Sequence, residues 1–374
     1  MAKKIYLDNA ATTKVNEKVV REMDKYLIEE YGNPSSQHLM GEKAREEIDR
    51  ARENIAKEIN AKPWEIIFTS GGTEANNIAI QGLAKANPEK KKIIISEIEH
   101  PSITEPCKHM ESLGYKIVKT PVDAKGHVRL DILEKEIDNS TLLVSIMHVN
   151  NIIGVVQDIS KIIEICKKKG TLFHTDAVQS LGKIGIDVSE GIDLLSASAH
   201  KINGPKGSGF IYIRSGVKVE PIFYGGGQEK GIRSGTENVP GIIGFARALE
   251  IQKKVNKDKI KAIRDKIIEG LQNIGGKING SIEDRIYNNV HVSFPLIESG
   301  VLVEYLSKKG IYVSSGSACE SKKEMEDRTL KAIGLTSLEA KGSIRITINE
   351  ELLEEDVGFV LGEIEKGVKK LSLK

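Results

Sequence analysis

The stretch ISKIIEICKKKGTLFHTDAVQS, residues 159–180, decides the fold. Its first part, Ile159–Lys169, has a helical pattern, ends in three lysines and is followed by Gly170. Cations in the last turn and a glycine after it are typical of a helix end. The next segment, Leu172–Thr175, is apolar and β-rich, and a polar stretch begins at Asp176. A helix that leads directly into a buried strand predicts one unit of an α/β sheet.

The same alternation extends over about residues 60–250 and predicts a large α/β domain with a mainly parallel sheet. We place this domain at residues 16–251. The other expected helices are Asn76–Leu83, capped by Thr73, and a helix from about Thr104 to Leu113. The other expected strands are Glu65–Thr69, Lys92–Ser96, Lys116–Lys119, Leu142–His148 and Asp193–Ser196. Ligands bind such sheets at the carboxyl ends of the strands.

A smaller α+β domain is expected from residues 252–374 together with residues 1–15. A long charged helix, about Gly241–Leu271, should lead into it from the large domain. The remaining expected elements are strands Asn289–Phe294, Ile311–Ser314 and Ser343–Thr347, helix Gly300–Lys308 and a final helix from Glu354.

Composition excludes several functional classes. The 374 residues carry 55 lysines and arginines against 53 acidic residues, so a net charge of +2 gives no basis for nucleic-acid or membrane binding. No apolar stretch approaches the roughly 18 residues that span a bilayer, and the first residues lack a signal core. Three widely spaced cysteines without a CxxC pair argue against a zinc site and favour a reducing compartment. We therefore expect a cytoplasmic protein.

Two strand ends carry candidate chemistry. The segment Ser198-Ala-His-Lys201 follows an apolar strand and leads into a glycine-rich turn ending at Gly209. Lys201 is placed to form a Schiff base with an aldehyde cofactor, and nearby polar groups and amides can hold a phosphate. The alternative is an ordinary turn with a surface lysine. Asp176 ends another strand and can hold a pyridinium proton, with Gln179 three residues later, although a helix N-cap is the common role there.

Three further segments give weaker signals. The loop Ser70-Gly-Gly-Thr73 enters a helix, and its amides suit a phosphate, but such loops are frequent. His100 precedes Pro101 at a strand end and can stack on a flat ring, or is an ordinary loop residue. Asn151 can bond a cofactor or substrate, or is a turn residue before Gly154.

The cysteines and one arginine complete the candidates. Cys319 lies in a small, polar stretch that we expect to be exposed, where a thiol is a liability unless it reacts. Cys107 and Cys166 lie in helical patterns and are expected to be inert core residues. Arg345 lies between apolar neighbours on an expected strand. It can clamp a carboxylate with two hydrogen bonds, although a structural salt bridge is the usual role.

Together these segments resemble one family over essentially the whole chain, from Tyr6-Leu-Asp-Asn-Ala-Ala-Thr-Thr13 to the final helix. The family is the cysteine desulfurases, in the aminotransferase class V group of fold-type I pyridoxal-phosphate (PLP) enzymes. Gly231-Ile-Arg-Ser-Gly-Thr236 and Ser314-Ser-Gly-Ser-Ala-Cys319 are the most specific matches, and the latter resembles the NifS/IscS branch. The matching positions are Thr73, His100, Asn151, Asp176, Gln179, Ser198, His200, Lys201, Thr236, Cys319 and Arg345.

The resemblance implies a role for each position. Lys201 would bind PLP covalently, Asp176 would hold the pyridine nitrogen, and His100 would cover the ring and act in catalysis. Gln179 and Asn151 would hold ring substituents, and Arg345 with Asn151 would bind the substrate. The phosphate would be held by Thr73, Ser198 and His200, with Thr236 contributed by a second subunit of a homodimer, and Gly72 and Ala199 would also bind the cofactor.

The implied activity converts L-cysteine to L-alanine and leaves a persulfide on Cys319. The sulfur would pass to an acceptor protein, such as an iron–sulfur scaffold or a tRNA-thiolation enzyme, with no metal site of the enzyme's own. Cys319 would at most ligate an iron–sulfur cluster transiently. The alternatives are another class V activity, such as selenocysteine lyase or aminotransferase, or a non-catalytic sulfur-transfer scaffold.

Two departures from the family pattern affect these expectations. Ile152 stands where the family often has glutamate, and no proline follows the cysteine segment. We expect residues Ser317–Asp327 to form a mobile arm, because small and charged side chains there have little to bury.

Overall fold

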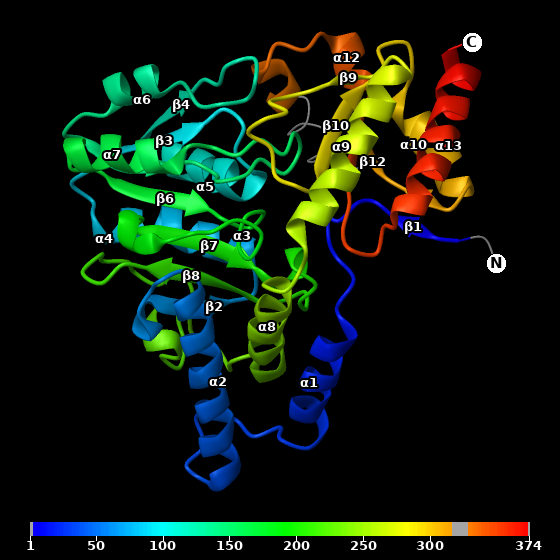
Figure 1. The fold of residues 1–374 in the computed structure, drawn as a ribbon. Helices are drawn as coiled ribbons and strands as arrows, with labels where there is room; N and C mark the ends of the chain where they lie inside the picture. The colour runs from blue at the N-terminus through cyan, green and yellow to red at the C-terminus, as the bar shows by residue number, and fades with distance from the viewer. Residues whose placement is uncertain (1–2, 316–327, 373–374) are drawn as a thin grey trace.

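The computed structural model describes residues 3–315 and 328–372. Its larger part contains a seven-stranded sheet with the order β2-β8-β7-β6-β5-β3-β4 (Figure 1). Strands β7, β6, β5, β3 and β4 pair in parallel, and β8 runs antiparallel to both of its neighbours. The mainly parallel sheet is therefore confirmed. The strands are β2 (Ile66–Thr69), β3 (Lys92–Ser96), β4 (Lys116–Thr120), β5 (Thr141–Ser145), β6 (Leu172–Asp176), β7 (Leu194–Ser198) and β8 (Gly209–Ile213).

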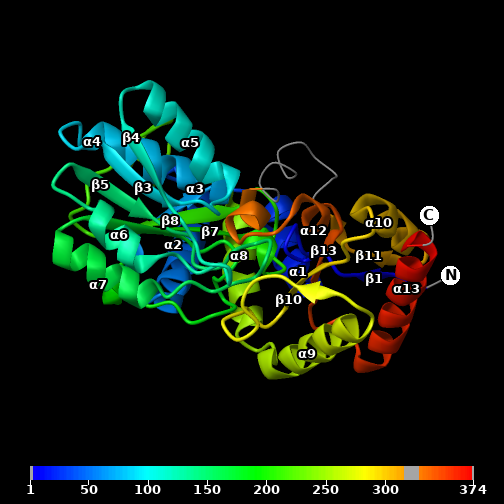
Figure 2. The ribbon, with the colours of Figure 1, turned by 90° about the horizontal axis from the view of Figure 1, so that it is seen from above.

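Helices cover both faces of this sheet, as Figure 2 shows from above. One face packs against α3 (Gly72–Asn77), α4 (Leu83–Ala86) and α5 (Pro101–Ser112). The other packs against α1 (Glu17–Ile28), α2 (Leu39–Glu58), α6 (Leu130–Glu136), α7 (Ile159–Lys169) and α8 (Val239–Gln252). Successive side chains of a strand point to opposite faces. Ile93 and Ile95 accordingly join the first core and Ile94 the second.

The smaller part contains a four-stranded antiparallel sheet and a parallel strand pair, which confirms its α+β character. The sheet order is β12 (Ser314–Ser315), β13 (Ser343–Thr347), β10 (Asn289–Ser293) and β9 (Lys277–Ile278), and β1 (Ile5–Tyr6) pairs with β11 (Ile311–Tyr312). Its helices are α9 (Lys257–Asn273), α10 (Ser299–Lys308), α12 (Ser337–Lys341) and α13 (Glu354–Ser372). Ile5 and Leu7 pack into the core of this smaller part. Leu330 and Ile333 instead pack into the core of the larger part, on the face of the sheet that Ile94 joins.

Three expectations about helices were wrong. The long helix over Gly241–Leu271 is two helices, α8 and α9, because the Asn256 side chain caps a new start by accepting from Lys259 N at 3.0 Å. The helix expected from Asn76 begins at Gly72 and continues through a π-helical turn, Ile78–Gly82. Its N-cap is Gly71 rather than Thr73, because Gly71 has φ +151°, a conformation that favours glycine.

Strand β8 and the start of α5 were also missed. The glycine-rich turn after Lys201 returns the chain antiparallel beside β7, from Ser198 paired with Gly209 to Leu194 paired with Ile213. Helix α5 begins at Pro101 because the ring of His100 caps it, with Nδ1 accepting from Ser102 N at 3.1 Å. In the described parts of the chain, no helix is both long and apolar enough to cross a bilayer.

Candidate active site

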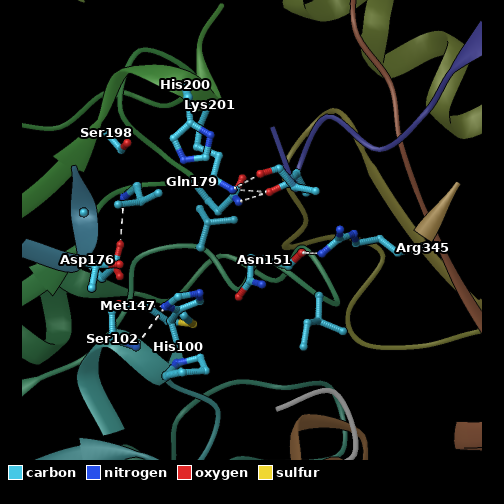
Figure 3. Close-up of a pocket in the computed structure, with 18 of the residues that line it drawn as sticks. His100, Ser102, Met147, Asn151, Asp176, Gln179, Ser198, His200, Lys201 and Arg345 are labelled. Carbon is cyan, nitrogen blue, oxygen red and sulfur yellow. Dashed lines mark hydrogen bonds between the residues drawn. The ribbon is translucent and has the colours of Figure 1, made fainter. Parts of the chain in front are cut away.

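A cavity of about 370 Å³ opens at the carboxyl ends of the sheet strands (Figure 3). Its walls come from β6, β7, the starts of α3 and α5, and strands β12 and β13. The segment near the N-terminus that contains Ala10 and Ala11, called here the N-terminal segment, also lines it. Ligands are expected at this edge of an α/β sheet. The structure brings ten of the predicted site residues to this cavity: Gly72, Thr73, His100, Asn151, Asp176, Gln179, Ser198, His200, Lys201 and Arg345.

Lys201 lies in a short 3₁₀ turn, Ala199–Lys201, that follows β7. Its Nζ donates to the carbonyl oxygens of Ala10 and Ala11 at 2.6 and 2.7 Å. The N-terminal segment that joins the smaller sheet therefore fixes the amine at the cavity. Sequence reasoning missed this contact because backbone carbonyls leave no sequence signal.

Asp176 is 6% exposed at the end of β6. Its Oδ1 accepts from the backbone N–H of Val178 at 2.9 Å, and Oδ2 accepts from Asn76 Nδ2 at 2.8 Å. Two donors from different elements fix the carboxylate, so it faces the cavity in one orientation.

Gln179 is fixed through both ends of its amide. Nε2 donates to Ala10 O at 3.0 Å, and Oε1 accepts from Lys183 Nζ at 3.3 Å. Burial lowers the pKa of Lys183 to about 8. Because Lys183 Nζ is held by Oε1, the Gln179 amide nitrogen is turned toward the N-terminal segment at the cavity wall.

Near Ser198 the wall of the cavity is formed by the backbone of glycine residues, and we call this part the glycine cradle. A Cβ on Gly72 would lie 2.6 Å from a Val178 methyl, and one on Gly209 would lie 2.5 Å from Gly71 Cα. The loop before α3 therefore packs closely against β8, with Gly71 beside the Ser198 hydroxyl. First-turn amides of a helix attract anions, so this end suits a phosphate.

The histidines at the cavity are neutral near pH 7. Burial lowers the pKa of His100, and burial together with the Lys201 charge lowers the pKa of His200 to about 4. His200 Nδ1 lies 3.1 Å from Thr12 Oγ1. His148 is buried near the site, and desolvation lowers its pKa to about 4. These rings accept or donate hydrogen bonds without adding charge.

Arg345 enters the cavity from β13 and is 8% exposed. One terminal nitrogen donates to Asn151 O at 2.9 Å and the other to Asp8 Oδ1 at 2.7 Å. Its Nε and the Asn151 Oδ1 are buried without hydrogen-bond partners. Unmade hydrogen bonds of buried groups are costly, so both atoms are ready to bind a polar ligand.

Glu99 is a buried acid that sequence reasoning missed. It is 0% exposed next to His100, and Oε1 accepts from Ser96 Oγ and Met147 N. Desolvation, assisted by the Asp176 charge, raises the pKa of Glu99 to about 8. The available sequence signal was an acidic residue directly before His100, in the expected β-to-α turn.

Two of the described residues that were predicted for the site, Ala199 and Thr236, do not line the cavity. Ala199 is buried, and its amide donates to Ser208 O at 3.0 Å instead of facing the cavity. Thr236 is exposed and does not line this cavity. Cys319, with its possible role at an iron–sulfur cluster, and the expected arm Ser317–Asp327 lie outside the described residues.

The residues present fit PLP on chemical grounds. An amine, a carboxylate and a glycine cradle match the aldehyde, pyridine nitrogen and phosphate of the cofactor. The unpartnered Asn151 Oδ1 and Arg345 Nε leave polar capacity for a ring substituent and a carboxylate.

Comparisons with known proteins place the chain in one family. The family model described as Aminotransferase class-V matches residues 5–359. The chain is 44% identical over 380 residues to cysteine desulfurase IscS of Dictyoglomus turgidum, covering 99% of this chain and 96% of that protein. A solved structure described as a NifS-like protein is 41% identical with a TM-score of 0.94, covering 99% and 100% of the two chains. A structure described as SspA in complex with cysteine is 36% identical with a TM-score of 0.83, covering 93% and 99%.

These matches run along nearly the whole chain and include the elements that build the cavity. The chain belongs to the aminotransferase class V family.

Proposed function

We propose that this enzyme is a PLP-dependent cysteine desulfurase that converts L-cysteine to L-alanine and forms a persulfide on Cys319. The observation that carries the proposal is one cavity that joins Lys201, Asp176 and Arg345. Identity of 44% over nearly the full length to an IscS cysteine desulfurase supports the choice of substrate.

The chain's own residues supply binding and orientation. PLP, when bound, supplies an electron sink for chemistry at the substrate Cα. Lys201 would hold the cofactor covalently, Asp176 would keep its pyridine nitrogen protonated, and the cradle at Gly72 would bind its phosphate. Arg345 would bind the cysteine carboxylate, because a guanidinium donates to a carboxylate through two parallel hydrogen bonds.

The proposed nucleophile is Cys319, and the two other thiols support this choice by their burial. Cys107 and Cys166 are 1% and 2% exposed, and burial raises the pKa of each thiol to about 12. The thiolate is the reactive form of cysteine. Neither buried residue therefore supplies a nucleophile at neutral pH.

The deciding assay incubates purified protein with PLP, reductant and L-cysteine and measures alanine and sulfide together. Equal amounts of both are expected, and a Lys201→Ala control should give neither. Turnover of L-selenocysteine without turnover of L-cysteine would instead indicate a lyase of selenocysteine. Absence of alanine from both substrates would indicate a scaffold.

We further propose a homodimer with Thr236 at the partner's phosphate. The loop that carries Thr236 is glycine-rich, and it follows Phe223 and Tyr224, which are 52% and 77% exposed. Exposed aromatic pairs are typical of protein interfaces. Tyr224→Asp should shift the sedimentation coefficient toward the monomer and reduce activity. A fully active wild-type monomer at assay concentration would contradict the proposal.

The sulfur acceptor is proposed to be another protein, such as an iron–sulfur scaffold or a tRNA-thiolation enzyme. The IscS relatives support the first of these classes. An odd number of cysteines supports a reducing compartment, so we propose a cytoplasmic location.

A further inference from the structure

A series of hydrogen bonds connects Asp176 to His100 along the cavity wall. Asn76 lies on α3 and is 0% exposed, and its Nδ2 is 2.8 Å from Asp176 Oδ2 and 2.8 Å from Ser102 Oγ. Ser102, 7% exposed on α5, places its Oγ 2.7 Å from His100 Nδ1. The backbone N–H of Ser102 donates to the same Nδ1 at 3.1 Å. Figure 3 shows Ser102 beside the ring of His100.

The Asp176 carboxylate determines the direction of every hydrogen bond in this series. A carboxylate only accepts, so the Asn76 atom that faces Asp176 is the amide nitrogen. The same nitrogen has no lone pair to offer and must also donate to Ser102 Oγ. Asn76 Oδ1 is buried without a partner, so this orientation is kept although one hydrogen bond is unmade.

The ring of His100 therefore receives a hydrogen bond on Nδ1. Ser102 Oγ accepts from Asn76 and has one hydrogen left, which points to Nδ1. The Ser102 amide points a second hydrogen at the same atom. Two donors that face one nitrogen require its lone pair, so in the neutral ring the proton lies on Nε2.

The surroundings keep this ring neutral. Burial is the main cause that lowers the pKa of His100. Among charged groups, Asp176 favours the protonated ring, whereas Lys201 and Arg328 oppose it. Arg328 also donates to the carbonyl oxygen of Glu99, the residue before His100, at 2.8 Å.

We propose that Asn76 and Ser102 are positioning residues that hold His100 as the Nε2–H tautomer, so that it presents a hydrogen-bond donor to the cavity. The identity of the group that this donor would meet in the cavity rests on the proposed function. The tautomer of His100 does not. A donor at this position suits the sulfur of a substrate bound as thiolate.

The test is nitrogen-detected NMR of protein carrying ¹⁵N-labelled histidine, with the His100 signals assigned from their loss in His100→Gln. The expected wild-type spectrum has a protonated Nε2 and an unprotonated Nδ1 that accepts hydrogen bonds. Ser102→Thr should keep this spectrum and most of the activity. Ser102→Ala should shift the Nδ1 signal and lower kcat about two- to tenfold, the range expected for one hydrogen bond.

Two results would overturn the proposal: an Nδ1-protonated ring in the wild type, or a Ser102→Ala variant whose spectrum and kcat equal those of the wild type. If Ser102→Ala does not fold, the wild-type and Ser102→Thr spectra decide alone. Failure of the proposed function would appear separately, as absent cysteine turnover by a protein whose His100 has the expected tautomer.

Discussion

Replacing Arg345 with alanine should weaken the binding of L-cysteine with little change in cofactor binding. In the structure one terminal nitrogen bonds Asp8, the other bonds Asn151 O, and Nε has no partner. A substrate carboxylate would gain charge-assisted hydrogen bonds from this buried guanidinium, worth about 1.5–3 kcal/mol. Each 1.4 kcal/mol corresponds to about tenfold in affinity, so the KM for cysteine should rise about ten- to hundredfold.

Loss of the ion pair with Asp8 is a second explanation for a rise in KM in Arg345→Ala. The assay must separate it from loss of the substrate contact. Asp8 and Arg345 have side chains 20% and 10% exposed, and the pair links the N-terminal segment to β13. Removing the arginine leaves the Asp8 carboxylate partly buried without its cation, which destabilises the fold. Asp8→Asn breaks the same ion pair but keeps the guanidinium, so it isolates the structural contribution.

The assay is steady-state alanine formation over a range of cysteine concentrations, with the melting temperature of each variant measured in parallel. Arg345→Lys should lie between wild type and Arg345→Ala, because an ammonium keeps the charge without the two-pronged geometry. Arg129→Ala is the matched control, since it removes an arginine–carboxylate pair on the surface. An unchanged KM in Arg345→Ala, or an equal rise in Asp8→Asn, would refute the carboxylate role.

The remaining predictions concern the cofactor lysine, the nucleophile and the buried acid. Borohydride reduction of the PLP-loaded protein should label Lys201, and a label on another lysine in the peptide map would disprove the assignment. Cys319→Ala should abolish sulfide release but keep the cofactor spectrum, whereas Cys166→Ala should retain activity; normal turnover by Cys319→Ala would exclude it as nucleophile. Burial raises the pKa of Glu99 to about 8 from 4.5. Protonated Glu99 therefore contributes to the free energy of unfolding in full below pH 4.5. This contribution falls by about 1.4 kcal/mol per pH unit and is lost as the pH rises through 8. Glu99→Gln should flatten this decline in melting temperature between pH 5 and pH 8, roughly the window these pKa values define, and a slope equal to wild type would contradict it.

The parallel part of the sheet was predictable because its strands are apolar segments that end in polar or glycine-rich turns. β3 and α7 lie within the expected residues, Lys92–Ser96 and Ile159–Lys169. Strand β8 was missed because its position depends on the turn after Lys201, which reverses the chain beside β7. A local pattern indicates a strand but does not specify its neighbour or direction.

The helix starts were less predictable because the capping groups are unusual. His100 caps α5 with a ring nitrogen, and Gly71 begins α3 at positive φ without a side chain. Common caps are serine, threonine, aspartate and asparagine, so a search for those residues favoured Thr73 and a later start for α5. Each cap places a helix N-terminus at the cavity, and the two corrections therefore change the description of the site.

The side chains of the cavity could be predicted, but the contacts that orient them could not. Lys201 is held by two carbonyl oxygens at the start of the chain, and Arg345 is held by Asp8 from the same segment. These partners lie more than 180 residues from the groups that they bind, with separations of 191, 190 and 337 positions. Pattern analysis has no signal for such pairs, because a carbonyl oxygen is present in every residue.

This N-terminal segment connects the two halves of the proposed reaction. Ala10 O accepts from both Lys201 and Gln179, which are expected to hold the cofactor, while Asp8 two residues earlier bonds the arginine expected to hold the substrate. The same segment is tied to β13, where Thr347 Oγ1 accepts from Ala10 N at 2.9 Å. A shift of the smaller sheet relative to the larger one would carry Asp8 and Arg345 with it and would change the contacts of Ala10 O with Lys201 and Gln179. The geometry between amine and carboxylate clamp is thus set by one short stretch of backbone, which explains why the cavity needs both parts of the chain.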